Sequence, residues 1–184
     1  MEETTPAPPR RAATLFVVVT VVLDMMAVGI VIPVWPKLIQ SVAGGGMDRT
    51  ALIYGVFASI FAAMQFLAAP IQGAMSDRFG RRPVILASNF GVGANYLVLA
   101  LAPNLAWLLV ARMLSGAFAA SISTSYAYLA DVNPPEKRAA AYGLLGGALG
   151  LGIAIGPAVG GLAGNFSAQA PFFVAAALSL ANGL

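Results

Sequence analysis

The chain has 184 residues, of which 59% are hydrophobic and only 9% are charged, and its mean hydropathy is +0.84. A soluble domain would carry close to one quarter charged residues, so the composition excludes a soluble fold and indicates a polytopic membrane protein, and the net charge of +3 comes from loops rather than from a nucleic-acid-binding face. Because the chain has no Cys and no His, disulfides, thiol chemistry and imidazole proton carriers are excluded, and proton chemistry in the membrane would require a carboxylate.

The N-terminal residues 1–11 are polar, contain three Pro residues and end in two Arg residues. We expect them to form a cytoplasmic tail, because short segments rich in Lys and Arg resist translocation. Most of the other basic residues fall near residues 73–83 and 131–138. These two segments are therefore predicted to be cytoplasmic loops, and the N-terminus is predicted to be cytoplasmic as well.

Six apolar segments follow the tail, and Gly, Pro or charged residues separate each from the next. The sixth segment is shorter than the roughly 20 residues that span a bilayer, so we expect the chain to end inside a truncated sixth helix. The sequence thus predicts an all-α, polytopic membrane bundle over residues 12–184, with an external loop at residues 36–50. The predicted helices cover residues 12–36, 51–75, 83–102, 105–130, 139–163 and 171–184.

Two ionisable residues, Asp24 and Arg112, lie within the predicted spans. Asp24 is roughly 15 Å from the cytoplasmic start of its helix, and Arg112 is roughly 10 Å from the outer end of its own. Asn95, roughly 18 Å into the third helix, shares this layer. Since intramembrane charges usually mark function, we predict a polar midplane site for a proton or a substrate. Alternatively, Asp24 and Arg112 form a buried pair that only fixes helix packing, or either bonds to backbone groups freed by Pro33.

Glycines recur at a spacing of four residues on the fifth predicted helix, at Gly152, Gly156 and Gly160. This spacing places them on one face, where another helix could approach closely. Taken alone, the stripe favours plain helix packing over a role specific to transport.

The basic segment between the second and third helices combines Arg residues with Asp77. Asp77 could accept hydrogen bonds from the free N–H groups at the start of the third helix. Arg81 could form an ion pair with Asp131 at the inner end of the fourth helix. The alternative is a solvated loop that only obeys the preference of basic residues for the cytoplasm.

Several motifs resemble the major facilitator superfamily of transporters. The segment Gly73-x-x-x-Asp77-Arg78-Phe79-Gly80-Arg81-Arg82 is similar to the signature loop between its helices 2 and 3. The segment Arg112-Met-Leu-Ser-Gly116 resembles its helix 4 motif, and Gly152-x-x-x-Gly156-Pro157-x-x-Gly160-Gly161 resembles the helix 5 motif of its drug/proton antiporters. Two further segments are similar to the tetracycline/proton antiporter branch: Leu23-Asp24 with the Gly and Pro residues after it, and Ala170-Pro171-Phe172-Phe173.

The resemblance implies that the chain is the N-terminal half of a twelve-helix fold, in which two six-helix bundles rock about a central site. It also implies that Asp24 and Arg112 act in the site and in proton coupling. One difference concerns the third helix, where the resembled tetracycline exporters carry an acidic residue and this chain has Asn95. The residues implied in a conformational latch of the outward-facing state are Gly73, Asp77, Arg78, Gly80, Arg81, Arg82 and Asp131.

The sequence and the resemblance together favour a proton-coupled efflux antiporter of a small amphipathic drug such as tetracycline, in a bacterial-type inner membrane. The expected partners are the lipid bilayer, protons, a small-molecule substrate and a missing C-terminal half, without nucleic acid, cofactor or metal. An uptake transporter for a metabolite and a non-transporting membrane fragment remain as alternatives. An enzyme is not expected, because no nucleophile with a base, metal cluster or nucleotide loop is present.

Overall fold

The computed structural model describes residues 10–119 and 121–184, so most of the predicted tail, residues 1–9, lies outside the described part of the chain. In that part the chain forms eight α-helices and no strand. The helices are α1 (Arg10–Val31), α2 (Trp35–Ala43), α3 (Met47–Phe79), α4 (Arg81–Ala100), α5 (Leu105–Ala117), α6 (Ser121–Val132), α7 (Pro135–Gly164) and α8 (Ala170–Asn182).

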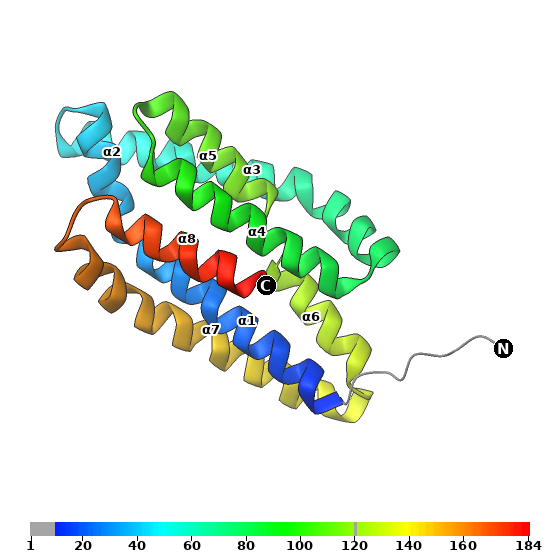
Figure 1. The fold of residues 1–184 in the computed structure, drawn as a ribbon. Coiled ribbons are helices and arrows are strands. Elements are labelled where there is room, and N and C mark those ends of the chain that lie inside the picture. The colour runs from blue at the N-terminus through cyan, green and yellow to red at the C-terminus, as the bar shows by residue number, and fades with distance from the viewer. Residues whose placement is uncertain (1–9, 120) are drawn as a thin grey trace.

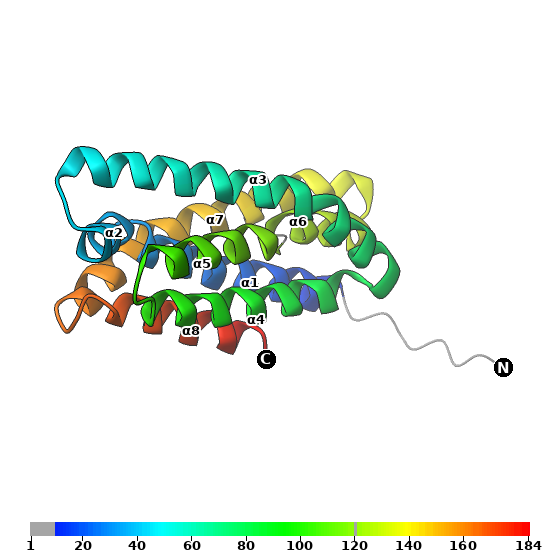
Figure 2. The same cartoon turned by 90° about the horizontal axis from the view of Figure 1, so that it is seen from above.

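Five helical segments are long and apolar enough to cross a membrane: α1, α3, α4, the α5–α6 pair and α7. The sixth apolar helix, α8, is shorter. The long helices run roughly alongside one another in a single bundle (Figure 1, Figure 2). Helix α1 packs against α7 and α8, α4 against α8, and α3 against α5, so each of these contacts joins segments distant in the sequence.

Two apolar clusters form the core of the bundle. The first gathers around the C-terminal half of α1 and includes Ile30, Leu99 and Phe172. The second gathers around the N-terminal half and includes Val21 and Leu129. On α1, Asp24 lies near the point where the residues of one cluster give way to those of the other. The candidate site is therefore a polar layer within an apolar core.

The prediction of one helix over residues 12–36 is wrong at its outer end. Helix α1 stops at Val31, and after a turn containing Pro33 the separate helix α2 begins. Pro36 lies in the first turn of α2, where its missing N–H leaves no helical bond unmade. Most of the predicted external loop is therefore helical. Helix α2 is amphipathic, with Trp35, Leu38 and Ile39 buried.

The predicted fourth helix, residues 105–130, is interrupted. Helix α5 ends at Ala117 and α6 begins at Ser121, so the described residues of this span form two shorter helices. A helix end leaves backbone carbonyls without an intrahelical partner. One of them, the carbonyl of Ala117, accepts a hydrogen bond from the side chain of Gln72 on α3.

Two other predicted helices are too short. Helix α3 extends about one turn beyond the predicted residues 51–75 at each end. Helix α7 begins at Pro135 rather than near residue 139, because Pro suits the first turn of a helix. The predicted cytoplasmic loop at residues 131–138 is accordingly reduced to a short connection between α6 and α7.

Candidate functional site

Asp24 lies at the meeting point of α1, α4, α6 and α8, and its side chain is buried, with the residue 8% exposed. Ser121, the first residue of α6, donates a hydrogen bond to Oδ2 of Asp24. Asn182, at the end of α8, donates from Nδ2 to Oδ1 of Asp24 at 2.9 Å and to the carbonyl of Thr20 at 2.9 Å. The carboxylate is thus held by neutral donors from two other helices.

A third helix contributes Asn89 of α4, which is 1% exposed. With its amide oriented to satisfy both neighbours, Nδ2 donates to Asp24 Oδ1 at 3.1 Å and to Oδ2 at 3.2 Å. In the same orientation its Oδ1 accepts from Asn182 Nδ2 at 3.1 Å. We call Asp24, Asn89, Ser121 and Asn182 the Asp24 cage.

Arg112 on α5 does not form an ion pair with Asp24 in the described part of the chain. Its guanidinium lies 4.9 Å from the centre of the Trp35 ring and 4.6 Å from that of Phe61. Its Nε donates to the carbonyl of Phe57 at 3.3 Å. The charge is therefore stabilised by aromatic faces and one carbonyl, and the predicted alternative of an Asp24–Arg112 pair is wrong.

Asn95 is buried on α4 and its Nδ2 donates to Ser115 Oγ on α5 at 2.6 Å. The described residues provide no partner for its Oδ1. Its neighbour Tyr96 interacts electrostatically with both Asp24 and Arg112. The three residues of the predicted midplane site share no direct bond in the described structure.

The glycine stripe of α7 packs on α1. A Cβ atom added to Gly156 would lie 2.5 Å from Cα of Gly29, and one added to Gly160 would lie 2.5 Å from the carbonyl oxygen of Ile30. Gly152 faces Met25 in the same way, whereas Gly161 faces open space. Pro157 lies inside α7 beside this contact. The stripe therefore allows the backbones of α1 and α7 to touch, which fixes the position of Asp24 relative to α7.

The turn between α3 and α4 brings three predicted latch residues together. Arg81 forms ion pairs with Asp77, at 2.7 Å from Nη1 to Oδ1, and with Asp131, at 3.0 Å from Nε to Oδ2. Its Nη1 also donates to Ser76 Oγ at 3.1 Å. Gly80 permits the turn, because its φ of 94° is one that side chains rarely allow. The hydrogen-bonded ion pair with Asp131 links the α3–α4 turn to the end of α6.

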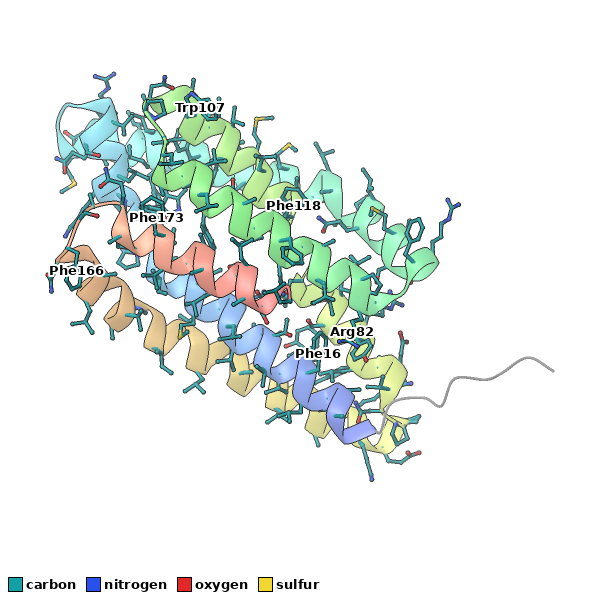
Figure 3. All side chains as sticks on the ribbon, in the orientation of Figure 1. Phe16, Arg82, Trp107, Phe118, Phe166 and Phe173 are labelled. Atoms are coloured by element: carbon teal, nitrogen blue, oxygen red, sulfur yellow. The ribbon has the colours of Figure 1, made fainter. Side chains whose placement is uncertain are left out.

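Other predicted latch residues have different surroundings. Arg82 stacks on Phe16 of α1 with 5.0 Å between the guanidinium and the ring centre (Figure 3). Arg78 lies over Phe79, at 5.3 Å. Gly73 faces open space. The prediction that Asp77 caps the following helix is wrong, since no side chain caps the start of α4 and Asp77 pairs with Arg81 instead.

Residues 16–184 match the family model described as Major Facilitator Superfamily. The chain belongs to this superfamily. Its members are membrane transporters of small molecules and not enzymes, so the chain is an integral membrane protein of a transporter family.

Relatives within the superfamily include the class C tetracycline resistance protein of Escherichia coli, which is 42% identical over 94% of this chain and 42% of the relative. The class B protein of Escherichia coli is 38% identical over 94% of this chain and 43% of the relative. The crystal structure of the human organic anion transporter TETRAN superposes with a TM-score of 0.79 at 27% identity, over 96% of this chain and 47% of the transporter. The chain thus spans less than half the length of these relatives and matches about half of a superfamily fold.

Of the Asp24 cage, the sequence predicted only Asp24 as a site residue. Asn89 and Ser121 stand out as polar residues in apolar spans, but nothing in their spacing relates them to Asp24, which is 97 positions from Ser121. Asn182 was not identified at all. An Asn within the mostly apolar residues 171–184 was the available signal, because polar residues inside membrane helices usually have a partner.

Proposed function

We propose that this chain forms one bundle of a proton-coupled efflux antiporter that exports a small amphipathic drug such as tetracycline across a bacterial-type inner membrane. The observation that carries the proposal is Asp24, a buried carboxyl whose described partners are all neutral. A carboxyl without a fixed counter-charge can exist in both protonated and ionised forms, which proton coupling requires. The relatives named as tetracycline resistance proteins support drug export as the direction and substrate class.

The proposed roles follow from position. Asp24 binds the coupling proton, while Arg112 and Asn95 contact the substrate around Tyr96. The unpaired Oδ1 of Asn95 is an acceptor that a substrate N–H or O–H group would satisfy. The predicted helix 5 motif includes Gly152, Gly156, Pro157, Gly160 and Gly161. Its residues Gly152, Gly156 and Gly160 hold α7 against α1 and so keep Asp24 in place.

The direct test is transport in inverted vesicles that contain the full-length protein. We expect an imposed proton gradient, acid inside, to drive tetracycline into the vesicles in exchange for protons moving out, and a protonophore to abolish this uptake. Accumulation driven in the opposite sense would favour the uptake transporter, and no gradient-dependent movement of any tested compound would favour a non-transporting fragment.

A second candidate substrate class is an organic anion. The specific observation is Arg112, whose guanidinium is half-buried against two aromatic rings without a carboxylate partner in the described structure. An anionic group would neutralise it. The solved relative named as an organic anion transporter is consistent with this class. Competition between tetracycline and a panel of organic anions in the same vesicles separates the two candidates.

We further propose that Gly73, Asp77, Arg78, Gly80, Arg81, Arg82 and Asp131 form a cytoplasmic latch. Replacing Asp131 by Asn is expected to slow transport at least several-fold, because it removes the ion pair with Arg81 that joins α4 to α6. Its side chain is 56% exposed, so the cost in stability should stay below about 1 kcal/mol. Transport rates and thermal unfolding of the purified variant measure the two effects.

The matched control is Asp48→Asn, which removes an exposed acid from the first turn of α3 without breaking a described ion pair. Equal transport by the Asp131→Asn variant and the unmodified protein would refute the latch. A large loss of stability with no change in the rate per folded molecule would refute it too.

A further inference from the structure

The hydrogen bonds of the Asp24 cage are balanced for an ionised carboxylate. An ionised Asp offers only acceptors, and three groups donate to it, from Ser121, Asn182 and Asn89. Oδ1 of Asn89 accepts from Asn182 Nδ2, which shares its two hydrogens among this oxygen, Asp24 Oδ1 and the carbonyl of Thr20. While Asp24 carries its charge, each side-chain N–H or O–H donor named in the cage thus faces an acceptor.

Protonation of Asp24 breaks this balance. The carboxyl gains an O–H donor, which needs an acceptor. The amide NH2 group of Asn89 that faces it is itself a donor. Turning the Asn89 amide by half a turn places its Oδ1 where its Nδ2 was, 3.1 and 3.2 Å from the two Asp24 oxygens. The turned amide therefore accepts the bond that the protonated acid must donate.

The turn also changes what Asn182 meets. In the turned orientation Asn89 Nδ2 lies 3.1 Å from Asn182 Nδ2, so two donors face each other. The same Nδ2 lies 3.5 Å from the backbone oxygen of Asn182, which can accept a hydrogen bond. Asn89 thus has two orientations with different partners: the Asn182 side chain in one and its backbone in the other.

We propose that Asn89 and Asn182 are positioning residues that relay the protonation state of Asp24 from α1 to the end of α8. This inference rests on the proposed role of Asp24 as a proton-binding group. In the ionised state the two amides are bonded to each other and to Asp24. In the protonated state the Asn89 amide turns and its bond to the Asn182 side chain is lost, while Asn182 Nδ2 keeps its bonds to Oδ1 of Asp24 and to the carbonyl of Thr20 on α1.

Among the residues that the structure describes, one titratable group interacts with Asp24. Tyr96 on α4 interacts electrostatically with Asp24. The described contacts of Asp24 with α6 and α8 are with uncharged Ser121 and Asn182, and α7 approaches α1 here through Gly152. A pH effect at the cage is therefore carried by Asp24 itself, with Tyr96 as the group whose Phe variant must be compared.

A double-mutant cycle tests the relay without any transport measurement. Asn89→Leu, Asn182→Leu and the double variant of the purified full-length protein are unfolded thermally at one acid and one alkaline pH. We expect the two changes to be non-additive at alkaline pH and additive at acid pH, and additive at both values when Asp24 is Asn. The same coupling at both pH values in the protein with Asp24 would overturn the relay. Asn89→Gln and Asn182→Gln replace any Leu variant that does not fold.

Transport provides the second readout. Each Leu variant is expected to displace the pH dependence of proton-driven transport by about one unit, a tenfold change in proton concentration at half-maximal rate. The control Asn165→Leu, in the exposed turn after α7, should leave it in place. If the pH dependence of transport is unchanged in both the Asn89→Leu and the Asn182→Leu variant, the two amides have only structural roles. If the unmodified protein shows no proton-dependent transport, the proposed function fails, while the stability cycle still decides the relay.

Discussion

Replacing Asp24 by Asn is expected to lower proton-driven transport by the full-length protein about 100-fold, the scale on which losing a proton-transfer group affects enzymes. The amide is nearly isosteric and cannot bind and release a proton near neutral pH, so coupling is lost while the shape of the cage is kept. Initial rates of substrate uptake into inverted vesicles under an imposed gradient measure the effect.

The variant should still insert, because Asn182 can donate to the amide oxygen while the Ser121 hydroxyl accepts from the amide N–H. Exchange of labelled for unlabelled substrate at equilibrium, which needs no net proton movement, is expected to survive. Asp48→Asn at the exposed start of α3 is the matched change of charge and should have no effect. Retention of proton-driven transport by the Asp24→Asn protein would leave Asp24 as a structural residue and remove the basis of the proposed antiport.

Replacing Gly156 by Val is expected to destabilise the bundle by about 3 kcal/mol, at the upper end of the cost of overpacking. The first added carbon would lie 2.5 and 2.6 Å from backbone atoms of Gly29 and 2.8 Å from the backbone nitrogen of Ile30. Backbone atoms on both sides leave no flexible side chain to move aside. Thermal unfolding of the purified protein should show a lower Tm by about 5–10 °C.

The control for this change is Gly161→Val on the same helix. A Cβ atom at Gly161 meets no atom within 4 Å among the described residues, so its effect on the stability of this bundle should be small. Equal Tm values for the two variants would contradict the assignment of Gly156 to the α1–α7 contact. A loss confined to Gly161→Val would instead place the critical helix contact on the opposite face of α7.

Composition and hydrophobic runs predicted the membrane-spanning segments because the side chains of each span are apolar along most of its length, whether they face other helices or the outside of the bundle. They could not predict α2. Pro33 and Pro36 suggested a kink followed by a loop, whereas Trp35, Leu38 and Ile39 lie on one buried face at helical spacing. That spacing was visible in the sequence, but three Gly residues directly after it made a loop the simpler interpretation.

The interruption between α5 and α6 was harder to foresee, because residues 105–130 contain no Pro. What stabilises the break is tertiary: Gln72 on α3 bonds to the carbonyl of Ala117, and Ser121 turns toward Asp24 on α1. Neither partner can be found from local sequence. The same limit explains the error about Arg112, since depth along a helix places two residues in one layer but does not say which side each one faces.

The separate environments of Asp24 and Arg112 have a consequence for energetics. Because the two side chains do not neutralise each other, binding a proton to Asp24 changes the net charge of the buried region instead of breaking an ion pair. A net charge displaced within the bilayer is acted on by the membrane potential, which does about 2.3 kcal/mol of work per elementary charge for each 100 mV crossed in full. Transport through this site would then respond to voltage as well as to pH, even when the substrate is uncharged.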